Sequence, residues 1–380
     1  MQRPRPAQAG LLRDLTRPSQ IFSNLTPNWY ASIMGTGIVA VAAVTLPWQP
    51  RGLHTAALAV WALAAFLFVA LTAATITHWV CHPGAARRHL LNPVMGHFYG
   101  APPMAMLTVG AGTLLLGRDV LGLRAAVDID WILWLAGTAT GLAAATVMPF
   151  VMFTRHDVRP RPDSPFGGWL MPVVAPTVSA ATGALLVPYA PPGQARLALL
   201  LSCYAMFGLS VLASIVVITL LWYRLAVYKT GDATMVPTLW IVLGPLGQSI
   251  AAANLLGGVA SQALPAPYST ALQAFGVVYG VPVWGFGLLW GAIAGAITIR
   301  TAREHLPFSL TWWSFIFAVG STTEGTSGLA LHTGSDLFRV AAVLFYFGLV
   351  ATWITVAVRT ARGSLRGTLF LAPGQPTDTG

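Results

Sequence analysis

The chain has 380 residues, of which 56% are hydrophobic and only 8% are charged. A soluble domain carries roughly 25% charged residues, so this composition excludes an ordinary soluble protein and predicts an all-α integral membrane protein. The formal net charge of +10 does not indicate a nucleic-acid partner, because the 21 basic residues are spread between apolar segments and do not gather on one face.

Long stretches without Asp, Glu, Lys or Arg indicate spanning helices, because crossing a bilayer core takes about 20 apolar residues. The stretch at residues 233–299 is too long for one helix, and it is broken near residues 261–270, "SQALPAPYST". Ten helices are therefore expected in the lipid bilayer. In chain order they are 28–46, 54–77, 97–116, 131–152, 169–187, 196–222, 235–258, 270–299, 308–331 and 337–358.

These helices predict one transmembrane transport domain over residues 27–360, with cytoplasmic tails at 1–26 and 361–380. If the N-terminus is cytoplasmic, 16 of the 21 basic residues fall on the cytoplasmic side. An excess of Lys and Arg in cytoplasmic loops sets the orientation of membrane proteins. We therefore expect a multi-pass protein of the cytoplasmic (inner) membrane with both termini inside. The basic residues left outside are Arg51, Arg118, Arg124, Arg196 and Arg339.

The helix breakers are concentrated in the odd-numbered helices, which contain "MGTGIVA", "GAPPMAMLTVGAG", "MPVVAPTVSAATGA", "VLGPLGQSIAAANLLGG" and "FAVGSTTEGTSG". A kinked helix needs protein or a watery cavity to satisfy its freed backbone groups. This pattern predicts five helical hairpins around a central pore, with the odd-numbered helices inside. Glycines and a proline in the eighth helix depart from the pattern. Close packing of small residues is the alternative explanation.

No motif for catalysis or for a bound cofactor is present. His78 and His82, with Cys81 between them, have a spacing that can hold a metal, but they lie at a helix end beside Pro83, and a polar cluster at the membrane surface is the preferred interpretation. No carboxylate pair is available for general acid–base chemistry. We expect no catalytic residue, no metal and no cofactor, so a metal- or haem-dependent membrane enzyme is the least favoured class.

The ninth helix carries a large ring at membrane depth. Phe317 lies nine residues from Phe308, or about 14 Å, which is near the middle of a hydrocarbon core about 30 Å thick. Ser321 lies about 40° and Glu324 about 20° from Phe317 around the helix. A ring on this face could block a narrow pore to ions and water. Ordinary helix packing of Phe317 is the alternative.

Three segments resemble one transporter family. They are "PNWYASIMGTGIVAVAAV" (27–44), "NPVMGHFYGAPPMAMLTVGAG" (92–112) and "FSLTWWSFIFAVG" (308–320). They are similar to the first, third and ninth helices of the tellurite-resistance/dicarboxylate transporter (TDT) family, which is related to the plant slow-type anion channels of the voltage-dependent anion channel superfamily. The resemblance covers about residues 22–362.

The resemblance implies a homotrimer in which each protomer has its own pore, formed by the inner helices of five hairpins and closed by a phenylalanine of the ninth helix. In that family the gating ring follows a Trp-Trp pair after three residues. The gate is then expected at Phe317, after Trp312 and Trp313, with Phe315 as the competing candidate.

Polar and small residues of the inner helices are the candidates for lining this pore, where hydroxyl, amide and freed backbone N–H groups would bind an anion weakly. The pore-lining candidates are Ser32, Gly35, Thr36, Gly37, Gly110, Thr177, Ser179, Gln248, Asn254 and Ser321.

The expected function is transport of small anions (a dicarboxylate, sulfite, tellurite or an inorganic anion) through a Phe-gated pore. A proton-coupled secondary carrier for C4-dicarboxylates or oxyanions that uses Glu324 is the alternative, motivated by the face that Glu324 shares with Phe317. The resemblance gives Glu324 no role. Its other interpretation is a carboxylate hydrogen-bonded to Thr322, Thr323 or Thr326, or one that faces another helix.

Overall fold

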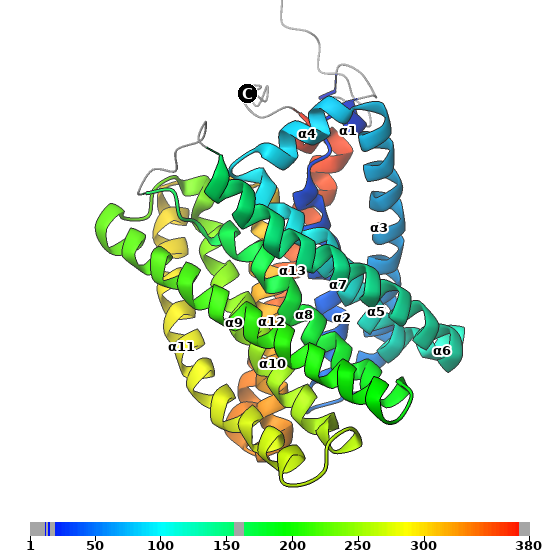
Figure 1. Ribbon diagram of the computed structural model, residues 1–380. Coiled ribbons are helices and arrows are strands. Elements are labelled where there is room, and N and C mark those ends of the chain that lie inside the picture. The colour runs from blue at the N-terminus through cyan, green and yellow to red at the C-terminus, as the bar shows by residue number, and fades with distance from the viewer. Residues whose placement is uncertain (1–11, 13, 16–19, 156–162, 372–380) are drawn as a thin grey trace, which may run out of the picture.

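The computed structural model describes residues 12, 14–15, 20–155 and 163–371, and within these ranges the regular structure is entirely helical. Figure 1 shows long helices running between two faces of a bundle. The short helices α1 (Gln20–Ser23) and α4 (Pro83–Leu91) lie at one face with the end of α13 (Asp336–Arg366). There the N–H of Leu12 donates to the carbonyl of Leu365. We call this end the terminal face.

Ten long helices follow one another in the predicted order, and they alternate between inner and outer positions. The inner helices are α2 (Tyr30–Thr45), α5 (Ala101–Gly112), α8 (Leu170–Leu186), α10 (Leu243–Val259) and α12 (Trp313–Thr333). The outer helices are α3 (Leu53–Cys81), α7 (Leu123–Thr154), α9 (Gln194–Tyr228), α11 (Tyr268–Glu304) and α13. The all-α fold with ten helices is thereby confirmed.

The five inner helices form a closed ring. Each packs against the next, from α2 through α5, α8, α10 and α12 back to α2. The first four inner spans are 67–89% buried, against 17–33% for the outer spans, and α12 is buried along most of its length. The inner positions predicted from the glycines and prolines of the odd-numbered helices are therefore those in the structure.

Within the described part of the chain, nine helices are long and apolar enough to cross a membrane. The tenth, α12, falls short because of its Ser, Thr, Gly and Glu residues, and its position inside the ring explains why it need not face lipid. The last outer helix, α13, runs to Arg366 and so extends past residue 361, where the sequence predicted that the C-terminal tail begins. Residues 372–380 and most of the predicted N-terminal tail lie outside the described ranges.

Every inner helix begins with 3₁₀-helical turns at its terminal-face end, which the sequence analysis did not predict. These turns are η1 (Pro27–Trp29), η2 (Met95–Gly100), η4 (Gly167–Trp169), η6 (Ala233–Val242) and η8 (Leu310–Trp312). None of the outer helices begins with such turns, so the same two-part inner element recurs five times. This recurrence supports five hairpin repeats around one axis.

Indole N–H groups join inner and outer helices by donating to threonine hydroxyls. Trp313 of α12 donates to Thr360 of α13 at 3.1 Å, and Trp353 of α13 donates to Thr36 of α2 at 3.2 Å. Such hydrogen bonds between membrane helices contribute about 0.6 kcal/mol each on average. Three further pairs follow the same pattern: Trp61–Thr113, Trp240–Thr298 and Trp284–Thr326.

Candidate functional site

The axis of the inner ring is constricted by apolar side chains. The cavity left at this point is only about 10 Å³, at or below the space that one water molecule needs. All five inner elements contribute to its wall. The lining residues are Met34, Met104, Met171, Val174, Ile241, Gly244, Ser314, Phe317 and Ala318.

Phe317 supplies the aromatic ring at this constriction, and it is buried. On the neighbouring inner helix, α10, a Cβ added to Gly244 would lie 3.8 Å from Cδ1 of Phe317, so the ring faces a glycine. The competing candidate, Phe315, packs edge-on against Trp240 and Trp312, with ring centroids 5.4 and 5.7 Å away. Of the two predicted gate residues, only Phe317 lines the constriction.

A repeated spacing brings the other constriction residues to the axis. Met34 lies five residues after Trp29, and Met104 lies five residues after Tyr99. Val174 lies five residues after Trp169, and Phe317 lies five residues after Trp312. In the fourth inner segment the spacing is shorter: Gly244 is at the fourth position after Trp240. Sequence reasoning missed the methionines, although an aromatic residue five positions earlier in four of the five inner segments was a signal that could have found them.

A polar cluster lies beside the constriction, farther from the terminal face. The side-chain amide of Gln248 on α10 donates to Oγ of Ser321 at 3.2 Å and to Oε2 of Glu324 at 3.0 Å. Ser321 is fully buried, whereas Glu324 is partly exposed. The backbones approach closely here, because a Cβ on Gly247 would lie 2.4 Å from the carbonyl carbon of Ser321. The structure thus joins two predicted lining residues with Glu324.

The threonines considered as partners of Glu324 bond elsewhere. The hydroxyls of Thr322, Thr323 and Thr326 donate to carbonyls of their own helix, four residues earlier. Threonine hydroxyls in helices commonly make this bond. The hydrogen-bond donor to Glu324 is therefore the side-chain amide of Gln248, on a neighbouring inner helix.

The other predicted lining residues are not brought to the constriction. Thr36 accepts a hydrogen bond from Trp353 of α13, and Asn254 donates to the carbonyl of Gly276 on α11. Both therefore face outer helices. None of the ten predicted lining residues lines the constriction cavity itself. Two of them, Gln248 and Ser321, belong to the adjacent polar cluster. The other eight are Ser32, Gly35, Thr36, Gly37, Gly110, Thr177, Ser179 and Asn254.

A second carboxyl group within the bundle, Asp130 on α7, was not found by the sequence analysis. It is fully buried, and neither oxygen has a hydrogen-bond partner among the described residues. A Cβ on Gly110 of α5 would lie 2.5 Å from Oδ1 of Asp130, so the glycine makes room for the carboxyl group. The predicted lining residue Gly110 therefore faces an outer helix.

Three histidine rings lie close together near the terminal face, and two of them, His78 and His89, are stacked. His78 lies 5.5 Å from His89 and 6.3 Å from His82, measured between ring centroids, and Nδ1 of His78 lies 2.6 Å from the carbonyl oxygen of Phe22. Burial lowers the pKa of His89, which favours its neutral form. No group of three metal-ligating side chains occurs in the part of the chain that the structure describes.

Comparison with known proteins identifies this architecture. The family model of the voltage-dependent anion channel (SLAC1) matches residues 24–361. The sulfite efflux pump SSU1 of Trichophyton rubrum is 29% identical over 354 residues, covering 92% of this chain and 93% of that protein. An uncharacterized transporter of Methanocaldococcus jannaschii is 24% identical over 357 residues, covering 92% and 96%. The chain belongs to the voltage-dependent anion channel family, and it is therefore a membrane channel or transporter chain and not an enzyme.

Proposed function

We propose that this protein moves small anions through the axis of the inner ring, and that the Phe317 ring closes this path. The observation that carries the proposal is the constriction of about 10 Å³, to which all five inner elements contribute and Phe317 supplies the ring. Apolar constrictions gate by excluding water as well as ions. Three methionines complete the plug, and their flexible side chains can move without breaking polar contacts.

Sulfite is the first substrate to test, because the relative from Trichophyton rubrum is described as a sulfite efflux pump. The neutral donors near the constriction would also suit chloride, nitrate, tellurite or a dicarboxylate such as malate. The placement of the basic residues favours the terminal face as cytoplasmic, in the inner membrane. We expect a homotrimer in which every protomer has its own path.

The test is anion flux into proteoliposomes at a clamped potential, with chloride, nitrate, sulfite and malate. Removing the ring in Phe317→Ala should raise flux by roughly tenfold or more, because the plug loses its largest side chain. Phe315→Ala is the matched control: it removes the same volume two residues away, from a cluster with Trp240 and Trp312. Equal leakage of both variants, or of neither, would refute Phe317 as the gate.

A proton-coupled carrier is the second candidate, favoured by the position of Glu324 next to the constriction. A carrier would saturate with substrate and would move protons together with the anion. Anion-driven acidification of the vesicle lumen, measured with a trapped pH dye, distinguishes it from a channel. Flux that follows voltage and concentration alone would exclude the carrier.

A further inference from the structure

The five inner helices contain only one residue of the types Asp, Glu, Lys and Arg, and this residue is Glu324 of α12. Their other residues are apolar, small or polar without charge, and His332 lies in the last turn of α12. An ionisable side chain within a membrane bundle is costly and is commonly functional. Any full charge that an anion meets along these helices before the last turn of α12 therefore comes from the Glu324 carboxyl group.

Glu324 lies on the side of α12 that faces the axis. Its two ring neighbours are α2 and α10. Gly320 packs against α2 and Gly325 packs against α10, because Cβ atoms added to them would lie 2.6 and 2.7 Å from atoms of those helices. Around α12, Glu324 falls between these two glycines and about 20° from Phe317. It therefore shares the arc that carries Phe317 to the constriction.

The other side chains at the level of Glu324 are apolar. All five inner helices begin at the terminal face, so seven residues carry each of them about 10 Å farther along the axis and back to within about 20° of the same face. Counted from Met34, Met104, Val174, Gly244 and Phe317, the positions reached are Val41, Ala111, Ala181, Ala251 and Glu324. The first four are buried, whereas Glu324 is partly exposed.

No basic side chain bonds to Glu324 among the described residues. Its hydrogen-bond donor is the uncharged amide of Gln248. Nδ1 of His332 lies 2.9 Å from a carbonyl oxygen of its own helix, and Arg339 of α13 pairs with Asp336 at 3.0 Å. The charged residues of the adjacent outer helices α11 and α13 all lie near the ends of these helices. The carboxyl group is therefore without a countercharge at its level of the ring.

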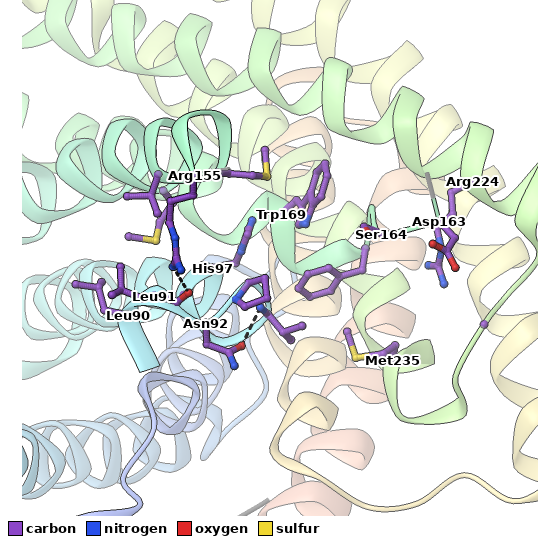
Figure 2. A pocket seen from close by; sticks show the side chains of 18 of the residues that line it. Leu90, Leu91, Asn92, His97, Arg155, Asp163, Ser164, Trp169, Arg224 and Met235 are labelled. Carbon is purple, nitrogen blue, oxygen red and sulfur yellow. Dashed lines mark hydrogen bonds between the residues drawn. The ribbon is translucent and has the colours of Figure 1, made fainter. Parts of the chain in front are cut away.

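The arginines shown in Figure 2 belong to outer segments at the terminal face. Arg155 directly follows α7, and Arg224 belongs to α9. Both donate to backbone carbonyls, at 2.8 and 3.0 Å. Glu324 lies beyond the constriction from this face, so these arginines supply no countercharge at its level.

A fixed charge acts on a passing anion in proportion to the charge of that anion. An ionised Glu324 therefore raises the barrier for a dianion by twice the amount by which it raises the barrier for a monoanion. The neutral donors of Gln248 and Ser321 can bind either kind of anion. In the inner helices no Lys or Arg offsets the greater repulsion of a dianion.

We propose that Glu324 selects singly charged anions over doubly charged ones. This inference rests on the proposed function, because it concerns anions that pass Phe317. The substrate class is then that of monoanions such as chloride, nitrate and hydrogen sulfite, while sulfate, malate and the sulfite dianion are disfavoured. Sulfite in neutral water is a mixture of both protonation states, and hydrogen sulfite is the form expected to cross.

Flux of chloride and of sulfate into proteoliposomes tests the selection, at a clamped potential and at pH 9, where neither anion titrates. Removing the charge in Glu324→Gln should raise chloride flux roughly threefold and sulfate flux roughly tenfold, because the factor for a dianion is the square of that for a monoanion. Glu324→Asp keeps the charge and should keep the chloride-to-sulfate ratio of the wild type. Glu304→Gln, at an exposed glutamate that ends α11, is the matched control and should change neither flux.

An unchanged chloride-to-sulfate ratio in Glu324→Gln would overturn the proposal. An equal change of this ratio in Glu324→Asp and Glu324→Gln would also overturn it, since size and not charge would then select. The same measurements in a Phe317→Ala background separate the two levels of inference. Absence of anion flux in both backgrounds contradicts the proposed function and this inference with it. Chloride flux that rises in Phe317→Ala, with a ratio that does not respond to Glu324→Gln, contradicts the charge selection alone.

Discussion

The Gln248 amide on α10 donates a 3.0 Å hydrogen bond to the Glu324 carboxylate on α12, about two helical turns beyond Phe317. The same amide donates to Ser321, so one glutamine holds two groups of the helix that carries the ring. On the proposed path, an anion that crosses the constriction would meet this cluster. The Glu324 side chain would repel the anion when this side chain is ionised, and it would not repel the anion when it is protonated.

Transport of chloride should therefore depend on pH through Glu324. As the pH rises, Glu324 loses its proton, the added negative charge repels the anion, and flux falls. Glu324→Gln keeps an oxygen that can accept from Gln248 but cannot ionise, so its flux should stay at the level the wild type reaches in acid. The measurement is chloride flux from pH 5 to pH 9, because chloride itself does not titrate.

Gln248→Leu is the companion variant for this experiment. It removes the donor but leaves the carboxylate, so it should retain a pH dependence that Glu324→Gln lacks. If the wild type and Glu324→Gln share one pH profile, the carboxylate has no part in transport, and the proton-coupled carrier loses the group proposed to couple it.

Gly244 leaves space beside the Phe317 ring. An alanine methyl group there would lie 3.8 and 4.0 Å from two atoms of the Phe317 ring, an ordinary contact distance. Gly244→Ala should therefore fold normally, and because alanine favours the helix over glycine, its stability should be unchanged or up to about 1 kcal/mol higher. It should nevertheless lower flux severalfold, because the ring loses the space into which it could turn. In the Phe317→Ala background the same change should have little effect, and this coupling can be measured as a double-mutant cycle of fluxes.

Gly247 provides the contrasting control. Its added Cβ would lie 2.4 Å from the backbone of Ser321, so Gly247→Ala should lower the melting temperature markedly, whereas Gly244→Ala should not. An equal loss of flux from Gly244→Ala with and without the Phe317 ring would show that the glycine acts on something other than the ring.

The sequence predicted the ten helices, their alternation and the shared face of Phe317, Ser321 and Glu324. Each follows from local chemistry: apolar length gives a span, breakers require a protein environment, and a 100° step fixes the angles within one helix. In the structure, the side-chain amide of Gln248 donates hydrogen bonds to both Ser321 and Glu324, as expected for two residues on one face of a helix.

The rotation of each helix about the axis could not be predicted in this way. Periodicity gives angles within a helix but not which side of the helix faces its neighbours. The predicted pore-lining residues are therefore small and polar ones, which assumes that the pore is polar. Thr36 and Asn254 instead bond to outer elements, and methionines occupy the axis. Asp130 escaped because its packing against Gly110 joins two helices that no local pattern connects.

The contact between Gly110 and Asp130 predicts a rescue. Gly110→Ala would place a methyl group 2.5 Å from Oδ1 of Asp130, and overpacking of this kind costs about 1–3 kcal/mol. Asp130→Ala removes the obstacle together with a buried polar group that lacks a partner. The double variant should therefore unfold at a higher temperature than Gly110→Ala alone. Additive losses in the thermal melts of the detergent-solubilised proteins would contradict this contact.

Asp232 caps the turns that lead to the constriction. Its carboxylate accepts hydrogen bonds from the backbone N–H and the hydroxyl of Thr234, both at 2.8 Å, immediately before η6. These bonds lower the pKa of Asp232 below its usual value. A lowered folded-state pKa means that the cap contributes stability above the unfolded-state pKa of about 4 and loses it as the pH falls through the folded-state value.

Asp232→Asn separates this cap from other effects of acid. Asparagine caps as well as aspartate but does not ionise, so the variant should keep its cap at pH 3 while the wild type loses a contribution of about 1 kcal/mol or less, since the site is exposed. Melting temperatures between pH 7 and pH 3 should therefore converge or cross. Asp128→Asn, at an exposed aspartate of α7, controls for the lost surface charge. Trp240 and Ile241 lie in η6, and Gly244 follows it at the start of α10. Loss of the cap should therefore disturb the constriction wall, so acid should change the flux of the wild type. Asp232→Asn should not show this acid-induced change in flux, whereas Glu324→Gln should still show it.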